Sequence, residues 1–573
     1  MKLRILKRNI RANIDSIYPD EIFLDSKNLP QFETERLEGV LEKPITTRTF
    51  FLVAGLYVIL LAIFASRAFG LQVISGENYR ERSEQNSLKH ILIPAERGLI
   101  YDRNAVELAW NTDLGRAYIE EEGFGHVLGF IGYPNEEEVK SKSLNPDVLI
   151  GKEGVEESYE RKLGGRSGIQ IVETDVSGTV ISENLLTTPL AGESVTLSID
   201  SEVQEKLYQV IRSLALDRGF LGGSGIIMDT DTGEIIALTN FPEYNPTILS
   251  HGEDTEAIEE YRLDSRKPFL NRAVQGLYTP GSIFKPFVAI GALDQGVINP
   301  ETEILANGQL SLPNPFDPEH PSIFRDWKVH GLVDMRNALA YSSNVYFFEI
   351  GGGFGSQKGI GIKNIERYAR RFGFGEPAGL GFLGEPAGVI PSPEWKEKVT
   401  SGEPWRVGDT YNTSIGQYGF QVTPVQVVRA IAAIAENGRL VQPTMIRSIS
   451  TKVNANDESI SIDIAPEYFE VVKEGMRRSA LYGTAAGLNI DTVEIAAKTG
   501  TAEVDPGKRY VNSWVIGFFP YEDPRYAFAI VMERGPRDNY IGGVFAARQL
   551  FDWMGIYASD YFSSFVDNEV GGT

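Results

Sequence analysis

The chain has 573 residues, which is more than one ordinary domain core holds, so about two to four folded units are expected. Hydrophobic residues make up 42% and charged residues 23% of the chain, a composition that excludes global disorder. The formal net charge of -23 disfavours nucleic-acid binding, and the absence of cysteine excludes disulfides, cysteine-ligated zinc and a cysteine nucleophile.

An uncharged apolar run, FFLVAGLYVILLAIFA, extends from Phe50 to Ala65. A helix over residues 49–69 has a length of about 30 Å, enough to cross a bilayer. The long segment 1–48 in front of it disfavours a cleaved signal peptide, and the lack of a polar stripe disfavours a buried core helix. We therefore predict one transmembrane helix at residues 49–69.

The tail at residues 1–48 begins with a basic cluster and then becomes acidic. This pattern fits either contact with anionic lipid or a solvated segment, and we favour the solvated segment. Basic residues lie on both sides of the apolar run, so their distribution does not decide which end faces the cytoplasm.

Residues 70–200 combine short alternating runs with turn signals, which predicts a small, mostly β module. Its one clear helix is expected at Gly154–Leu163, where Gly164 and Gly165 provide a stop signal. This module precedes a much larger domain.

The large domain is predicted at residues 201–565, with a short tail at 566–573. Ser201 and Gln204 match a capping box at the start of a helix. Apolar residues then follow at helical spacing: Val203, Leu207, Val210, Ile211 and Leu214.

Strand patterns lie at both ends of this domain. Residues 225–239 indicate two strands joined by a turn at Asp231–Gly233, and residues 493–504 and 512–535 indicate three consecutive antiparallel strands. The segment between these groups is largely helical or rich in glycine and proline. We predict an α/β (α+β) fold in which helices cover one sheet.

Three short motifs in the large domain carry side chains suited to acyl transfer. The first is SIFK, in which Ser282 is expected to open a helix and Lys285 to lie one turn further on the same face. A serine hydroxyl needs a neighbouring base, and a lysine serves as that base only if burial or another cation lowers its pKa.

The second motif is SSN, Ser342–Asn344, in a helix-like segment, where a hydroxyl can relay a proton and an amide can orient a peptide group. The third is KTGT, Lys498–Thr501, on a predicted strand. There Gly500 leaves room for a neighbouring backbone and Lys498 supplies a second cation.

Each motif has an ordinary structural alternative, such as a cap serine beside a surface lysine or a surface strand leading into a turn. The order of the three motifs along the chain and the elements they lie in favour a catalytic role over these structural alternatives. A serine-lysine pair at a helix start, a mid-domain serine-asparagine and a late lysine-threonine-glycine strand match the three-part pattern of serine penicilloyl enzymes.

The chain resembles the class B penicillin-binding proteins, and within them the cell-elongation type. The similarity extends beyond the three motifs to several blocks: RGLIYDRN, GKEGVEESYERKLGG, MDTDTGEIIAL, NRAVQGLYTPGSIFKPF, GEPAGVIPSPEWK and GDTYNTSIGQ. The segment HVLGFIGYPNEEEV favours the elongation type over the division type. The resemblance implies a penicillin-binding, serine β-lactamase-like transpeptidase domain on a mostly β pedestal at residues 70–200.

By this resemblance, Ser282 is the nucleophile that attacks the penultimate D-Ala carbonyl of a peptidoglycan stem peptide, and β-lactams acylate the same serine. Lys285 is then the base, and Ser342 with Lys498 forms the proton relay. Asn344 would bind the donor amide.

The strand motif supplies the rest of the implied substrate site. Thr499 and Thr501 would bind the terminal carboxylate beside Gly500, and the backbone N–H groups of Ser282 and Thr501 would form the oxyanion hole. No cofactor is implied.

The same resemblance implies partners and a location. The partners are peptidoglycan stem peptides, β-lactam antibiotics, a SEDS-type glycosyltransferase and membrane proteins of the elongation complex, with no nucleic acid. The location is the bacterial cytoplasmic (inner) membrane, with the N-terminus inside and the catalytic domain outside.

The sequence departs from the family pattern in three places. Only the segment 105–150 separates Asn104 from Gly151, so the membrane-distal head of the pedestal is expected to be shortened. The segment GQYGFQVTPVQ at 416–426 and the pair Asn512–Ser513 before Trp514 also differ from the usual residues.

No metal site is predicted. His320 and His330 lie near Asp317 and Asp326, but loop or core roles are the favoured interpretation over a surface zinc. Two functional alternatives remain open: a membrane-bound β-lactamase or β-lactam sensor with the same motifs, and an inactive scaffold of the same fold.

Overall fold

The computed structural model describes residues 46–80, 88–142, 144–174, 179–313, 317, 319–447, 459–505, 507 and 509–563. The chain forms two compact units, residues 1–89 with 173–181 and residues 90–172 with 182–573. Most of the predicted tail, residues 1–45, and the predicted C-terminal tail, residues 566–573, lie outside the described residues.

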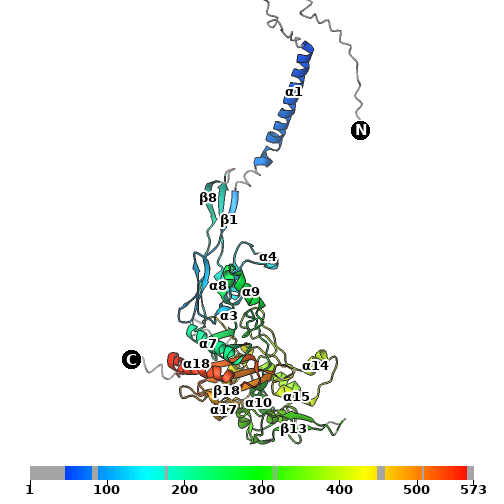
Figure 1. The fold of residues 1–573 in the computed structure, drawn as a ribbon, viewed down its shortest axis with the longest axis vertical. Coiled ribbons are helices and arrows are strands. Elements are labelled where there is room, and N and C mark those ends of the chain that lie inside the picture. Colours follow the sequence, from blue (N-terminus) through cyan, green and yellow to red (C-terminus); the bar gives the residue numbers. More distant parts are fainter. Residues whose placement is uncertain are drawn as a thin grey trace, which may run out of the picture. The chain divides into compact units, whose positions relative to one another are not determined.

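The predicted membrane segment is helical. Helix α1, Thr47–Phe69, continues into a π-helical turn, η4, Gly70–Ile74 (Figure 1). The Thr46 side chain caps the helix by accepting a backbone N–H of the first turn. None of the α1 residues is buried, which argues against the core-helix alternative, and the whole stretch is long and apolar enough to cross a membrane.

The segment predicted as a mostly β module contains short strands in three sheets. One sheet has the order β4-β3-β2-β9, a second has the order β1-β7-β8, and β5 pairs with β6. The strands are β1 Leu88–Ile93, β2 Ile100–Tyr101, β3 Glu107–Thr112, β4 Gly115–Tyr118, β5 Ile131–Gly132, β6 Ile150–Gly151, β7 Gly168–Thr174, β8 Val180–Thr187 and β9 Val195–Thr196.

The prediction of one helix in this module was wrong. Its described part contains α3 Gly125–Leu128, α4 Glu136–Lys142, α5 Gly154–Ser158 and α6 Glu160–Leu163. The expected helix 154–163 is interrupted at Tyr159, whose φ of -110° and ψ of 19° leave helical geometry. The carbonyl of Glu156 in this segment accepts a hydrogen bond from Arg97.

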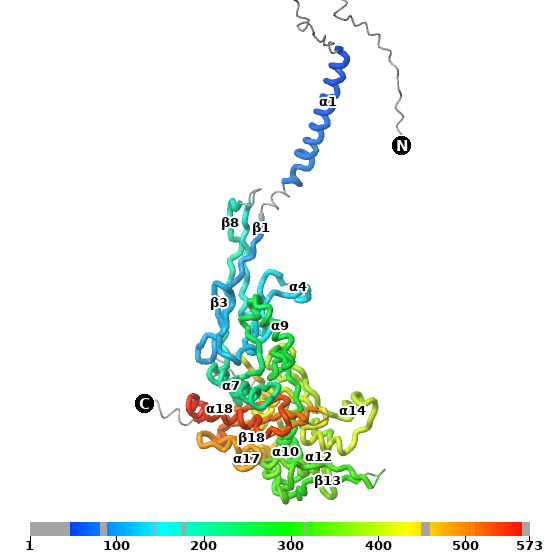
Figure 2. The backbone as a smooth tube through the Cα atoms, in the orientation of Figure 1, coloured from blue at the N-terminus to red at the C-terminus, as the bar shows by residue number. Residues whose placement is uncertain are grey.

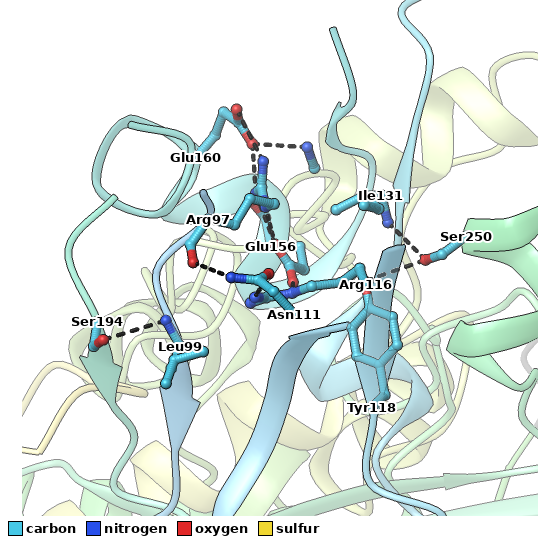
Figure 3. A network of polar contacts seen from close by, with 11 residues as sticks. Arg97, Leu99, Asn111, Arg116, Tyr118, Ile131, Glu156, Glu160, Ser194 and Ser250 are labelled. Atoms are coloured by element: carbon cyan, nitrogen blue, oxygen red, sulfur yellow. Dashed lines mark hydrogen bonds and ion pairs between the residues drawn. The ribbon is translucent and has the colours of Figure 1, made fainter. Parts of the chain in front are cut away.

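A buried ionic network joins this broken helix to the strands of the module (Figure 3). The Glu156 carboxylate accepts from Arg97 Nη2 at 2.7 Å and from Arg116 Nε at 2.8 Å, and its side chain is fully buried. Arg97 also pairs with Glu160 at 2.8 Å. The side chains of Arg97, Arg116 and Glu156 are therefore almost completely buried, and their charges compensate one another.

Replacing Glu156 with glutamine should destabilise the protein by about 3–5 kcal/mol, because two buried guanidinium groups lose their shared counter-charge. The measurement is the thermal unfolding temperature of the full-length protein in detergent. The matched control is Glu136→Gln, which removes an exposed i,i+4 pair with Lys140 and should leave that temperature unchanged. Equal unfolding temperatures for both variants would contradict the role of the network.

The large domain is built on one antiparallel sheet with the strand order β11-β10-β20-β19-β18. This confirms the two strand groups predicted from the ends of the domain. The strands are β10 Gly222–Asp229, β11 Ile235–Phe241, β18 Ala496–Glu503, β19 Tyr510–Phe519 and β20 Tyr526–Pro536.

Helices cover both faces of this sheet. Alternate strand residues such as Ile227 and Phe528 belong to the apolar cluster with α7, Ser201–Arg218, and α18, Gly543–Tyr557, which pack side by side (Figure 2). The intervening residues, such as Ile226, pack into the cluster formed with α10 Lys285–Asp294, α16 Pro424–Ala435 and α17 Pro466–Tyr482. The predicted class, a sheet covered by helices, is confirmed.

The predicted start of α7 is correct, but its cap is not the predicted one. Asp200 caps the helix by accepting from the backbone N–H groups of Glu202 and Val203. The Ser201 hydroxyl instead donates to Asp102 at 2.8 Å, and the Gln204 amide bonds to backbone groups of other segments. The capping-box prediction failed because partners distant in sequence engage both side chains.

The segment between the strand groups contains helices, as expected, and also small β-ribbons that were not predicted. The ribbons pair β12 Ile304–Ala306 with β15 Gly331–Val333, β13 Gln309–Leu312 with β14 Ser322–Arg325, and β16 Arg439–Leu440 with β17 Ile460–Ser461. The other helices and turns of the large domain are α8 Pro246–His251, α9 Thr255–Leu263, η5 Gly281–Phe284, α11 Met335–Ala340, α12 Asn344–Gly352, α13 Ile362–Arg371, α14 Pro393–Val399, α15 Val407–Ser414, η6 Ala486–Leu488 and η7 Ser559–Phe562.

Candidate active site

Ser282 lies in η5, a single 3-10 turn that runs directly into α10. The expectation that Ser282 opens the α-helix therefore needs a small correction, because the regular helix begins at Lys285. Gly281 enters the turn with a φ of 57°, and its N–H donates to the Gly416 carbonyl at 2.9 Å. The Ser282 side chain is partly exposed, and the residues on both sides of it are buried.

The loop after α15 presses against this turn. A Cβ on Gly416 would lie 2.2 Å from the Gly281 carbonyl oxygen, and Gly416 has a φ of 72°, so both space and conformation require glycine. The following Tyr418 packs its ring against Trp395 and Trp405. The unusual segment 416–426 thus retains the glycine that supports the turn.

Lys285 is completely buried, and its amine is held by the SSN motif. Nζ donates to the Ser342 carbonyl at 2.8 Å and to Asn344 Oδ1 at 2.7 Å, and it lies 3.3 Å from Ser342 Oγ. Burial lowers the pKa of Lys285 to about 7, against the opposing effect of the Asp326 charge. An amine in this setting can accept a proton near neutral pH.

The SSN motif forms a tight connection between α11 and α12, so the predicted helical setting was wrong for Ser342. Ser342 has a φ of 58°, a left-handed conformation that non-glycine residues seldom adopt. Ser343 caps α12 by accepting from the Tyr346 N–H, and Asn344 is the first helical residue. Helix α11 ends at Ala340 and α12 begins at Asn344, so three residues connect the two helices.

Lys498 approaches the same hydroxyl from β18. Its buried Nζ donates to Ser342 Oγ at 2.8 Å and to the Thr499 carbonyl at 2.9 Å. Burial, followed by the positive charge of Lys285, lowers the pKa of Lys498 well below its usual range. Ser342 Oγ therefore lies within hydrogen-bonding reach of two amines.

The KTGT strand lies alongside the Ser282 turn. A Cβ on Gly500 would lie 2.8 Å from both Ile283 Cγ2 and the Pro280 carbonyl oxygen. Gly281 faces the backbone of Thr501 in the same way. The predicted reason for glycine at position 500, close approach of another backbone, is therefore seen in the structure.

Replacing Gly500 with alanine should slow acylation by penicillin on the order of 10²-fold, because the added methyl group pushes the Ser282 turn away from β18. The check is the second-order rate constant for adduct formation, measured together with the unfolding temperature. A variant that reacts at the wild-type rate would show that the turn tolerates the displacement.

The two threonines of the strand differ in their surroundings. Thr501 is exposed, whereas the Thr499 hydroxyl donates to Thr484 Oγ1 at 2.7 Å. Thr484 follows α17 and was not identified from the sequence, because no local pattern connects it to the strand. The structure thus brings Ser342, Asn344, Lys285 and Lys498 into direct contact and places the Gly500 strand beside Ser282.

The histidine–aspartate pairs differ from each other. His320 and Asp317 form an exposed contact, whereas the side chains of His330 and Asp326 are fully buried and lie 3.5 Å apart. Within the described ranges, no group of three or more His, Asp and Glu residues is placed to hold a metal ion.

The unusual pair before Trp514 has a structural role. Asn512 sits at an irregularity between β19 and β20, and its Oδ1 accepts the Arg534 N–H at 2.9 Å. Ser513 Oγ accepts the Gly543 N–H at 3.1 Å, at the start of α18. Trp514 itself donates from Nε1 to the Thr279 carbonyl, just before the Ser282 turn.

Two family models match the chain. Residues 223–551 match the penicillin binding protein transpeptidase domain, and residues 108–197 match the penicillin-binding protein dimerisation domain. Among similar proteins, peptidoglycan D,D-transpeptidase MrdA of Acinetobacter baumannii is 30% identical, with 89% of this chain and 88% of the relative covered. MrdA of Escherichia coli K12 is 26% identical, with 87% and 93% covered.

Solved structures agree with this. Pseudomonas aeruginosa PBP2, solved in complex with WCK 5153, is 30% identical with a TM-score of 0.66, and 81% of this chain and 97% of that chain are covered. Helicobacter pylori PBP2, solved in complex with MreC, is 25% identical with a TM-score of 0.68, and 82% and 100% are covered. The chain therefore belongs to the penicillin-binding protein family, and the proteins described above show its similarity to the PBP2 type.

Proposed function

We propose that this chain is an elongation-type peptidoglycan D,D-transpeptidase that cross-links stem peptides through an acyl-enzyme on Ser282. One arrangement of residues supports this assignment most strongly. The amines of Lys285 and Lys498 both lie within hydrogen-bonding distance of Ser342 Oγ, and the strand that contains Gly500 lies beside the Ser282 turn. Relatives named peptidoglycan D,D-transpeptidase over most of the chain length support it.

In the first half-reaction, the Ser282 oxygen forms a bond to the penultimate D-Ala carbonyl carbon, and the peptide C–N bond breaks. Lys285 takes the serine proton, and the Ser342 hydroxyl, bonded to Lys498, passes a proton to the departing amine. The terminal D-Ala leaves. Backbone N–H groups of Ser282 and Thr501 stabilise the oxyanion in this proposal.

In the second half-reaction, an amine from a neighbouring stem peptide attacks the ester carbon. The new C–N bond replaces the ester bond, and the amine proton returns through the relay to the Ser282 oxygen. Thr499 and Thr501 bind the donor carboxylate before acylation. Asn344 orients the donor amide with its side chain, which already accepts from Lys285 at 2.7 Å.

The substrate lies outside the cytoplasm, so we place α1 in the bacterial cytoplasmic membrane with the N-terminus inside. The proposed partners are a SEDS-type glycosyltransferase and elongation-complex membrane proteins. The complex between the Helicobacter pylori relative and MreC supports partners of this second kind.

The test uses the full-length protein in detergent with a D-Ala-D-Ala pentapeptide donor, an amine acceptor and, separately, benzylpenicillin. We expect a cross-linked product with release of D-Ala, and a penicillin adduct that persists. Rapid turnover of the adduct would instead identify a β-lactamase. A protein that gives neither product nor adduct would be an inactive scaffold.

A further inference from the structure

Asp326 has no part in the steps above, yet it lies beside the residues that perform them. It occupies the connection between β14 and β15, and its side chain is fully buried. A buried carboxylate needs several donors around it. Those donors are the Ser343 hydroxyl and the backbone N–H groups of Val345 and Trp327.

The Asp326 carboxylate holds the residues on both sides of Asn344. Oδ2 accepts from Ser343 Oγ at 2.8 Å and from the Val345 N–H at 3.0 Å. Oδ1 accepts from the Trp327 N–H at 2.9 Å. The carboxylate therefore fixes the first turn of α12 from outside the helix.

The same turn also holds the Lys285 amine. Ser342 presents its carbonyl and hydroxyl oxygens to Nζ, and Asn344 presents Oδ1. Ser342 presents these oxygens from a left-handed conformation, which persists where neighbouring bonds enforce it. The bonds from Ser343 and Val345 to Asp326 are placed to enforce it.

Three charged or titratable groups surround Lys285. The Lys498 amine bonds to the same Ser342 hydroxyl as Lys285. Burial lowers the pKa of Lys285, and the negative charge of Asp326 acts to raise it. His330 is the third; burial is the main cause that lowers its pKa, so this imidazole is neutral near pH 7. The negative charge of Asp326 is therefore not cancelled by the ring 3.5 Å from it.

We propose that Asp326 is a positioning residue for acyl transfer, which holds the SSN turn against Lys285 and keeps a negative charge beside that turn. This inference rests on the function proposed above. It assigns the role to a residue that touches neither the nucleophile nor the implied substrate groups.

The test is the pH profile of penicillin acylation for the full-length protein and for Asp326→Asn. Loss of the negative charge disfavours the ammonium form of Lys285, so its free-base form appears at lower pH. The rising limb of the profile should therefore shift to lower pH, with a plateau lowered by roughly 10- to 100-fold. An unshifted limb, or a shift to higher pH, overturns the proposal.

Ser343→Ala is the matched control, because it removes one bond to the carboxylate and leaves the charge in place. Its plateau should fall while its inflection stays at the wild-type pH; a moved inflection would mean that the charge is not the cause. If Asp326→Asn does not fold, Asp326→Glu gives the second route. It keeps the negative charge but displaces the carboxylate from Ser343 and Val345, so the plateau should fall while the inflection stays near the wild-type pH, and a plateau at the wild-type level overturns the proposal.

These outcomes are separable from failure of the proposed function. If the wild-type protein forms no adduct at Ser282, the transpeptidase assignment itself is wrong. If the wild-type protein is acylated normally but the pH profile of Asp326→Asn is unshifted, only the role proposed for Asp326 is wrong.

Discussion

Replacing Ser282 with alanine is expected to abolish both the covalent penicillin adduct and the release of D-Ala from a pentapeptide donor. The hydroxyl is the only group of the Ser282 side chain that can form the ester, and it is partly exposed in a turn whose neighbours are buried. Intact-mass analysis after benzylpenicillin treatment measures the adduct directly.

The fold should survive this substitution, because the turn is held by backbone contacts to Gly416 and by the packing of Gly500. The control is Ser322→Ala on β14, where an exposed serine is removed and the adduct should remain. An adduct that persists in Ser282→Ala would place the nucleophile elsewhere and remove the mechanism.

Lys285→Met should lower the acylation rate by about 10² to 10⁴-fold, the usual contribution of a positioned general base. The wild-type rate should rise with pH through about 7, because the amine acts only when neutral and burial lowers its pKa to about 7. The variant should lose this inflection, since methionine has no proton to exchange.

Stopped-flow or gel-based acylation with a fluorescent penicillin across pH 5 to 9 measures both effects. Lys358→Met, which alters an exposed lysine, is the control and should keep the wild-type profile. A Lys285→Met protein that retains both the rate and the inflection would show that another group removes the serine proton.

The features that the sequence predicted well have local causes. The strand pairs β10–β11 and β19–β20 follow from apolar runs broken by turn residues, and the three motifs are short enough to be seen as residue patterns. Gly500 could be interpreted in advance because the need for space at that position is tied to one residue type.

The features that were missed depend on partners distant in sequence. Ser201 was predicted to cap α7, but its hydroxyl bonds to Asp102, 99 residues earlier. Thr484 accepts a hydrogen bond from Thr499, and the Ser342 carbonyl accepts one from Lys285, which lies 57 residues before it. The residue pattern within a single segment cannot predict contacts of this kind.

The role of Asp326 was also not predicted from the sequence. The sequence drew attention to it only as a neighbour of His330, in the context of metal binding. The structure shows that its hydrogen bonds come from other residues, among them Ser343 and Val345. A carboxylate that orients other residues has no sequence pattern of its own, because its partners are backbone groups and a common hydroxyl.

The two amines that meet at the Ser342 hydroxyl have a consequence for charge in the resting enzyme. Each is buried, and the positive charge of Lys285 further discourages one on Lys498. Near neutral pH the two amines together should therefore carry at most one positive charge rather than two. With one amine free, the pair can accept the Ser282 proton while another proton leaves through the Ser342 hydroxyl, so the same few atoms serve both half-reactions without net gain of charge.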